Sequence, residues 1–113
     1  MKLRLLLAGG LAALLAVAGA RPADAARVTW VKDYAEGMAK ARTEKRPVVL
    51  DFYADWCGWC KVMDRETYGN ADVAAVLTNY ICIKIDVEQD TDTAFTFRIG
   101  SLPRTIVVDA EGR

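Results

Sequence analysis

The order of apolar segments constrains the fold of this chain more than any other feature of its sequence. Segments with helical periodicity alternate with short runs of β-branched and aromatic residues, which are typical of strands. Strands are predicted over residues 28–30, 48–54, 80–87 and 104–109, and helices over 32–45, 57–67, 71–79 and 90–98. This alternation predicts an α/β domain with a largely parallel sheet.

Two segments carry more specific predictions. The run 48–54 is nearly continuous in apolar side chains, which suits a central strand buried on both faces. Asn70 follows a helix break and is predicted to cap the next helix, because an asparagine side chain accepts hydrogen bonds from free N–H groups. That helix is expected to bury Val73, Val76 and Leu77.

The first 25 residues have the composition of a secretory signal peptide. A short basic start precedes an apolar run over 5–20, and Ala23-Asp24-Ala25 has the small–x–small form of a signal peptidase site. Cleavage is predicted after Ala25, which leaves residues 26–113 as a single exported domain with no stable membrane insertion. A membrane anchor is the alternative, but a span needs about 20 apolar residues, and glycines interrupt this shorter run.

Charge and composition exclude several classes of function. Basic and acidic residues number 15 each, so the formal net charge is zero and a basic nucleic-acid binder is not indicated. The absence of histidine excludes a His-dependent catalytic triad and a His-rich metal site. The three cysteines fall short of the four ligands that a zinc site normally uses, so no metal site is predicted.

The main candidate site is Cys57-Gly58-Trp59-Cys60, which follows the predicted central strand and opens a helix. Its spacing places both sulfur atoms on the first helical turn. Free N–H groups and the dipole at a helix N-terminus favour a thiolate, so Cys57 is predicted to be the exposed nucleophile with the lower pKa. Cys60 is predicted to be more buried and to resolve the mixed disulfide. A structural disulfide, which would close only a small loop, and a copper(I) carrier remain alternatives.

Two stretches resemble the thioredoxin-like family. Residues 49–61, with Phe52, Ala54, Trp56 and Lys61 around the cysteines, are similar to the family's active-site segment, and residues 100–109 are similar to its cis-proline loop and the following strand. The resemblance covers residues 28–113 and is nearest to the C-terminal thioredoxin domain of thiol-disulfide interchange proteins. It implies a thioredoxin fold, with three layers and a central mixed sheet.

The resemblance also implies roles for individual residues. Asp51 stands where the family carries a buried carboxylate, which would move a proton to or from Cys60 through a water molecule. Pro103 is implied to be cis, beside the cysteine pair. The backbone of Leu102 would then pair with an extended substrate segment. The rest of the substrate-binding surface is expected to come from Trp56, Gly58 and Trp59.

The sequence departs from the family in three places. The dipeptide between the cysteines is Gly-Trp instead of Gly-Pro, so the direction of electron flow stays open. Cys82 stands where many thioredoxins carry a lysine near the buried aspartate, and we interpret it as a small core residue. The chain ends at Arg113, where the family usually continues with an edge strand and a final helix, so the domain is expected to be C-terminally incomplete.

These observations predict an exported, periplasmic thiol-disulfide oxidoreductase. It would reduce or relay electrons to protein disulfides through Cys57 and Cys60, with no organic cofactor. The expected electron donor is a membrane thiol-disulfide transporter. One alternative is an oxidase or isomerase of the same family, and another is a non-enzymatic chaperone or metal carrier that uses the same cysteines.

Overall fold

The structure, a computed structural model, describes residues 27–113, so the predicted signal peptide over 1–25 lies outside the described residues. The elements follow one another as β1 (Trp30–Val31), α1 (Tyr34–Glu44), β2 (Val48–Tyr53), α2 (Gly58–Glu66), α3 (Ala71–Leu77), β3 (Ile81–Asp86), α4 (Thr91–Thr96) and β4 (Arg104–Val108). This is the predicted order of strands and helices. The first strand begins two residues later and ends one residue later than expected, at 30–31 in place of 28–30.

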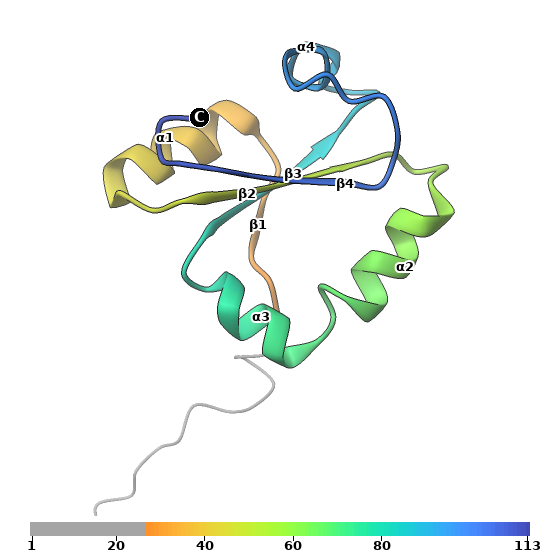
Figure 1. Ribbon diagram of the computed structural model, residues 1–113, viewed down its shortest axis with the longest axis horizontal. Coiled ribbons are helices and arrows are strands. Elements are labelled where there is room, and N and C mark those ends of the chain that lie inside the picture. The colour runs from red at the N-terminus through yellow and green to blue at the C-terminus, as the bar shows by residue number, and fades with distance from the viewer. Residues whose placement is uncertain (1–26) are drawn as a thin grey trace, which may run out of the picture.

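The four strands form one mixed sheet in the order β1-β3-β2-β4 (Figure 1). β3 is parallel to both β1 and β2, whereas β4 is antiparallel to β2. The register places Asp51 of β2 opposite Lys84 of β3. The prediction of a largely parallel sheet with β2 at its centre is therefore confirmed.

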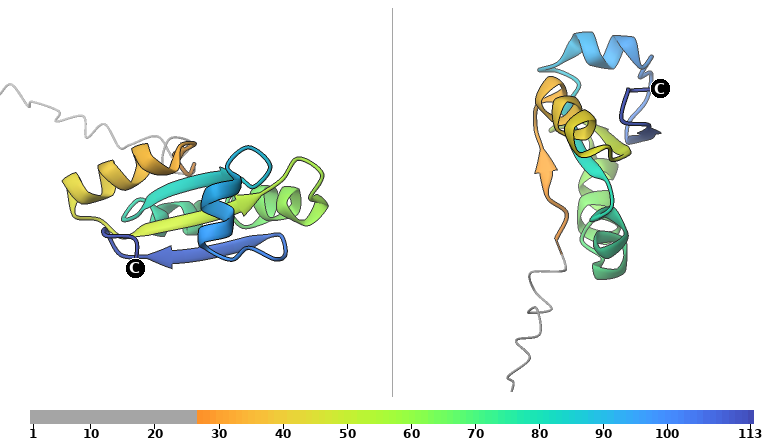
Figure 2. Two further views of the ribbon diagram at one scale, coloured as in Figure 1. Left: turned by 90° about the horizontal axis from the view of Figure 1, so that it is seen from above. Right: turned by 90° about the vertical axis from the view of Figure 1, so that its left-hand side faces the viewer.

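Helices cover both faces of the sheet, with α1 and α4 on one side and α2 and α3 on the other (Figure 2). On the first side, Met38 of α1 packs in one cluster with Leu50, Phe52 and Ile83. Side chains alternate along a strand, so Asp51 points to the opposite face, toward α2 and α3. The predicted three-layer α/β arrangement is confirmed, and the layer under α2 carries the polar part of the site.

Side-chain caps fix where the helices begin. Asp33 accepts a hydrogen bond from the N–H of Glu36 at 2.7 Å, and Asp90 accepts one from Thr93 at 3.1 Å. Asn70 accepts hydrogen bonds from the first turn of α3, at 2.9 and 3.2 Å. The predicted role of Asn70 is therefore confirmed, and each cap satisfies N–H groups that the helix itself leaves unpaired.

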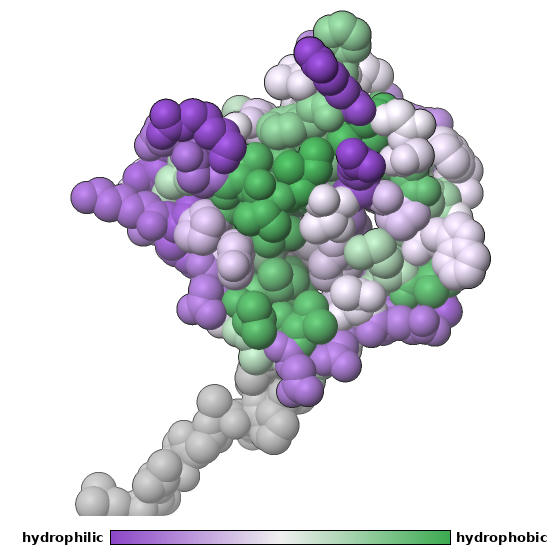
Figure 3. Space-filling model, in the orientation of Figure 1, coloured by the Kyte–Doolittle hydropathy of each residue, from purple (hydrophilic) through white to green (hydrophobic). Residues whose placement is uncertain are grey.

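The predicted buried face of α3 is partly wrong. Val76 is 59% exposed, and the buried residue of this helix is Ala74, with Val73 and Leu77 half-buried. Residues 73, 74 and 77 share one side of a helix, because successive residues are turned by 100°, and Val76 falls outside that arc. Hydrophobic surface extends across the side of the molecule that carries β4 and continues toward α3 (Figure 3).

Gly37 lies where α1 packs closely against Ile83 of β3, and replacing it with alanine should destabilise the protein. A β-carbon there would stand 2.3 Å from Cδ1 of Ile83, a fully buried side chain. Overpacking of about 1–3 kcal/mol outweighs the gain of about 1 kcal/mol in helix propensity, so we expect a net loss of about 1 kcal/mol. Urea unfolding of the oxidised protein measures this loss.

Gly58→Ala is the matched control, because a β-carbon at this helical position meets nothing within 4 Å. A Gly37→Ala protein as stable as wild type would show that Ile83 rearranges without cost.

Candidate active site

Cys57 and Cys60 form a disulfide at the start of α2, with their Cα atoms 5.3 Å apart. Cys57 is the N-cap of α2, and its Sγ accepts a hydrogen bond from the N–H of Cys60 at 3.1 Å. The N–H of Cys57 in turn donates to the carbonyl of Ala54 at 3.0 Å. The pair is thus close enough to bond, as predicted, and the Sγ of Cys57 lies where a helix N-terminus stabilises negative charge.

The predicted difference in exposure between the two cysteines is wrong. Each is only 4% exposed, because the disulfide packs with Ala54 under Tyr53, Val87 and Leu102. Burial therefore does not distinguish the two cysteines in the oxidised protein; they differ in that the Sγ of Cys57 accepts the hydrogen bond from the N–H of Cys60.

The other predicted contact residues lie around the pair. The Leu102–Pro103 peptide bond is cis, as the resemblance implied, and Leu102 packs against the disulfide cluster. Trp56 and Trp59 are 68% and 72% exposed on either side of Cys57 in the sequence, and Gly58 is exposed between them. The buried disulfide is therefore flanked in the sequence by two large exposed indoles and contacted by Leu102 of the cis-proline loop.

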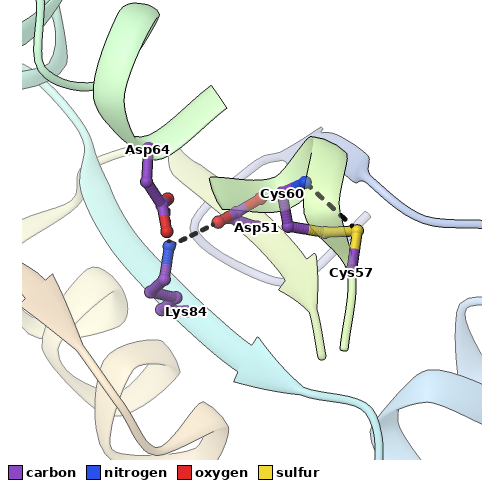
Figure 4. The surroundings of a disulfide bond; sticks show 5 residues. All are labelled: Asp51, Cys57, Cys60, Asp64 and Lys84. Atoms are coloured by element: carbon purple, nitrogen blue, oxygen red, sulfur yellow. Dashed lines mark hydrogen bonds and ion pairs between the residues drawn. A yellow bond between two sulfur atoms is a disulfide. The ribbon is translucent and has the colours of Figure 1, made fainter. Parts of the chain in front are cut away.

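Asp51 belongs to a group of three charged side chains behind the disulfide (Figure 4). Its side chain is 4% exposed and accepts a hydrogen bond from Lys84 Nζ at 2.8 Å. Lys84 Nζ also donates to Asp64 Oδ1 on α2 at 2.6 Å and lies 4.8 Å from the ring centroid of Trp30. The interaction that the structure gives Asp51 is thus with Lys84, and the predicted route to Cys60 stays a prediction.

Burial and ion pairing shift the pKa values of Asp51 and Lys84 in opposite directions. Burial raises the pKa of Asp51, and the hydrogen bond and charge of Lys84 offset this only in part. Burial lowers the pKa of Lys84, but its bonds to Asp51 and Asp64 outweigh that effect, so its pKa lies above the ordinary value. Lys84 is therefore the cation that lets a buried Asp51 ionise.

The placement of Cys82 near the buried aspartate is wrong, and Lys84 takes that position. In the register, Cys82 stands opposite Val49 and Lys84 stands opposite Asp51. Both residues face the α2 side of the sheet, but they lie two residues apart along β3. Cys82 is a buried free thiol whose Sγ lies 3.7 Å from the carbonyl oxygen of Leu77, so its interpretation as a small core residue is confirmed.

Cys82 should resist alkylation in the native protein. Burial raises the pKa of its thiol to about 11, so ionisation alone makes its reaction about a hundredfold slower at pH 8 than that of an ordinary thiol of pKa about 9. Mass spectrometry after iodoacetamide treatment of the oxidised protein should find no adduct, and one adduct after unfolding in urea. Rapid labelling of the folded protein would contradict the burial.

Three polar residues of this region were not predicted as functional: Lys84, Asp64 and Glu88. Glu88 accepts a hydrogen bond from the indole N–H of Trp56 at 2.5 Å. The alternation of β3 places Lys84 on the face of Asp51, but only the register brings the two charges together. No sequence signal pairs Glu88 with Trp56.

Within residues 27–113, no group of three or more candidate ligands is placed to hold a metal ion. In the same range, no helix has the length and hydrophobicity to cross a membrane.

Comparison with protein families gives a match over residues 29–110 to a family model described as thioredoxin-like. The thiol:disulfide interchange protein DsbD of Ralstonia nicotianae is 42% identical over 106 residues, which cover 86% of this chain and 17% of the relative. The protein of that name from Vibrio vulnificus is 35% identical over 86 residues, covering 73% and 14%. The chain thus spans about one-sixth of the length of these relatives.

Solved structures show the same fold. A structure titled DsbH oxidoreductase superposes with a TM-score of 0.71 at 21% identity, covering 86% of this chain and 76% of that one. The thioredoxin NaTrxh of Nicotiana alata gives a TM-score of 0.59 at 28% identity, covering 76% and 75%. The predicted thioredoxin fold is therefore confirmed for the described residues.

Proposed function

Since the chain belongs to the thioredoxin-like family, we propose that it is a thiol-disulfide oxidoreductase that passes electrons to the disulfides of other proteins through Cys57 and Cys60. The observation that carries the proposal is the position of the disulfide. It caps the first turn of α2, with the Sγ of Cys57 accepting the N–H of Cys60. The similarity to thiol:disulfide interchange proteins over most of this chain supports the same activity.

The reaction consists of two thiol–disulfide exchanges. In the reduced protein, the Cys57 thiolate attacks one sulfur of a substrate disulfide, forms a mixed disulfide and releases the other substrate sulfur as a thiolate. The Cys60 thiolate then attacks the Sγ of Cys57, restores the Cys57–Cys60 disulfide and releases the second substrate sulfur. Two electrons pass to the substrate, and the helix N-terminus stabilises the Cys57 thiolate before attack.

Asp51 is proposed as the group that takes the proton of Cys60 before the second exchange, through a water molecule. Burial raises the pKa of Asp51, which makes its carboxylate a stronger base than an exposed aspartate. Lys84, bonded at 2.8 Å, keeps the ionised form accessible in a buried position. Substrate contacts are proposed for Trp56, Gly58, Trp59, Leu102 and Pro103, which surround the disulfide.

Reduction of insulin by dithiothreitol, with and without the protein, tests the activity. Wild type should accelerate the reaction, and Cys57→Ser should not. A folded wild type without effect would contradict the enzyme and favour a binding module that uses the cysteines to hold a ligand. Redox titration of the pair then fixes the direction of electron flow: a potential near −270 mV resembles thioredoxin, and about −120 mV marks an oxidant.

We further propose that the protein is exported and that a membrane thiol-disulfide transporter reduces it in the periplasm. The support is the composition of residues 1–25 together with the need of any reductase outside the cytosol for a donor. Mass spectrometry of protein from the periplasmic fraction should find Ala26 as the first residue. Full-length protein retained in the membrane or the cytosol would contradict cleavage and export.

A further inference from the structure

Trp56 is a large exposed side chain whose single polar atom is nevertheless held in place. Its indole N–H donates to Oε1 of Glu88 at 2.5 Å, across 32 residues of sequence. Both residues are exposed, so this bond adds little to the stability of the fold. Its effect is to fix the orientation of the Trp56 indole, which adjoins Cys57 in the sequence. Among the described residues, the indole of Trp59 has no such partner.

The acceptor itself stands on an ordered turn. The N–H of Glu88 donates to Oδ1 of Asp86 at 3.0 Å, and the N–H of Val87 donates to the carbonyl of Tyr53 at 2.9 Å. These bonds tie the turn after β3 to the end of β2, one residue before Ala54. Since Ala54 accepts the N–H of Cys57, the carboxylate and the disulfide are positioned from the same strand end.

We propose that Glu88 is a positioning residue for substrate binding, which holds the indole of Trp56 as a fixed wall of the surface beside Cys57. The inference rests on the proposed function and specifies one determinant of substrate affinity. A side chain already fixed in its binding orientation loses less conformational freedom when an extended substrate segment packs against it. Glu88 touches neither sulfur, so it should affect affinity and leave the electron transfer unchanged.

Glu88→Ala and Glu88→Gln separate the hydrogen bond from the negative charge. With insulin as the substrate, Glu88→Ala should raise KM about threefold to tenfold, with kcat and the redox potential of the Cys57–Cys60 pair unchanged. Glu88→Gln keeps an acceptor oxygen and should stay close to wild type. Glu111→Ala removes an exposed carboxylate at the opposite end of the sheet and serves as the control.

A double-mutant cycle with Trp56→Phe tests whether Glu88 acts through the indole N–H. Phenylalanine keeps an aromatic ring but has no donor, so Glu88→Ala should have no further effect on KM in that background. In ¹H–¹⁵N spectra, Glu88→Ala should move the indole resonance of Trp56 more than those of Trp30 and Trp59.

Several outcomes would overturn the inference. The first two are an unchanged KM in Glu88→Ala and an equal effect of Glu88→Ala on KM in the wild-type and Trp56→Phe backgrounds. The others are a Glu88→Gln protein with the same KM as Glu88→Ala, and an indole resonance of Trp56 that Glu88→Ala does not move. Each of these leaves the proposed function intact, provided that wild type reduces insulin. A wild type that does not reduce insulin removes the proposed function, and this inference falls with it.

Discussion

Cys60→Ser is expected to stop the reaction after its first exchange and to leave Cys57 covalently joined to a substrate sulfur. Serine is close in size to cysteine but supplies no thiolate, so nothing attacks the Sγ of Cys57 to release the bound protein. Turnover should fall to that of the buffer control. Non-reducing electrophoresis of cells that express the variant should show bands that collapse with dithiothreitol, and mass spectrometry of those bands identifies the natural partners.

The same experiment with Cys57→Ser assigns the nucleophile. The oxidised protein buries both cysteines equally, so the assignment depends on the hydrogen bond that the Sγ of Cys57 accepts from the backbone of Cys60. Cys57→Ser should therefore trap nothing. Adding Cys82→Ala to Cys60→Ser should not change the trapped partners, because Cys82 is buried on β3. Equal trapping by the two single variants would contradict the assigned order of attack.

Lys84→Met is expected to destabilise the oxidised protein by about 3 kcal/mol at pH 7, the size of effect seen when a buried ion pair loses one partner. Asp51 would keep its burial but lose the ammonium at 2.8 Å. Asp51→Asn should change stability by less than about 1 kcal/mol, because Lys84 keeps Asp64 at 2.6 Å and the amide fills the same space. Urea unfolding at pH 7 measures both variants.

The loss in Lys84→Met should depend on pH in one direction. Burial raises the pKa of Asp51, so the folded protein binds this proton more tightly than the unfolded chain does. Without Lys84 this pKa rises further. The part of the loss that comes from Asp51 is absent below its pKa in the folded wild type, because there the carboxyl is protonated with or without Lys84. Above that pH it grows by up to about 1.4 kcal/mol per pH unit until the pH exceeds the higher pKa of Asp51 in the folded variant.

Asp51→Asn combined with Lys84→Met is the control for that mechanism. It removes both charges, so most of the stability should return and the difference from wild type should vary much less between pH 4 and 7. If the double variant is as unstable as Lys84→Met, the loss comes from the packing of the lysine chain against Trp30 and Tyr53, not from an unpaired carboxylate.

The sequence predicts this fold well because its signals are local. Each of these signals depends on neighbours within a few residues: the runs of β-branched and aromatic residues, the cap at Asn70 and the cysteines at the start of α2. Lys84 was missed because its function arises from the register of two strands whose paired residues are 33 positions apart, and a single strand's pattern does not contain that offset. The exposure of Val76 and the bond from Trp56 to Glu88 likewise depend on how separate elements meet.

Cys57 and Cys60 are three residues apart in the sequence, so their disulfide closes only a short loop at the start of α2. So short a loop removes little freedom from the unfolded chain, and the fold should not require it. A thermodynamic cycle then joins two quantities that are usually measured separately. The difference in unfolding free energy between the oxidised and reduced protein equals the shift in the pair's potential from that of the unfolded chain, at about 1.4 kcal/mol for each 30 mV. Two urea titrations, one for each redox state, therefore give the difference between the redox potential of the folded protein and that of the unfolded chain.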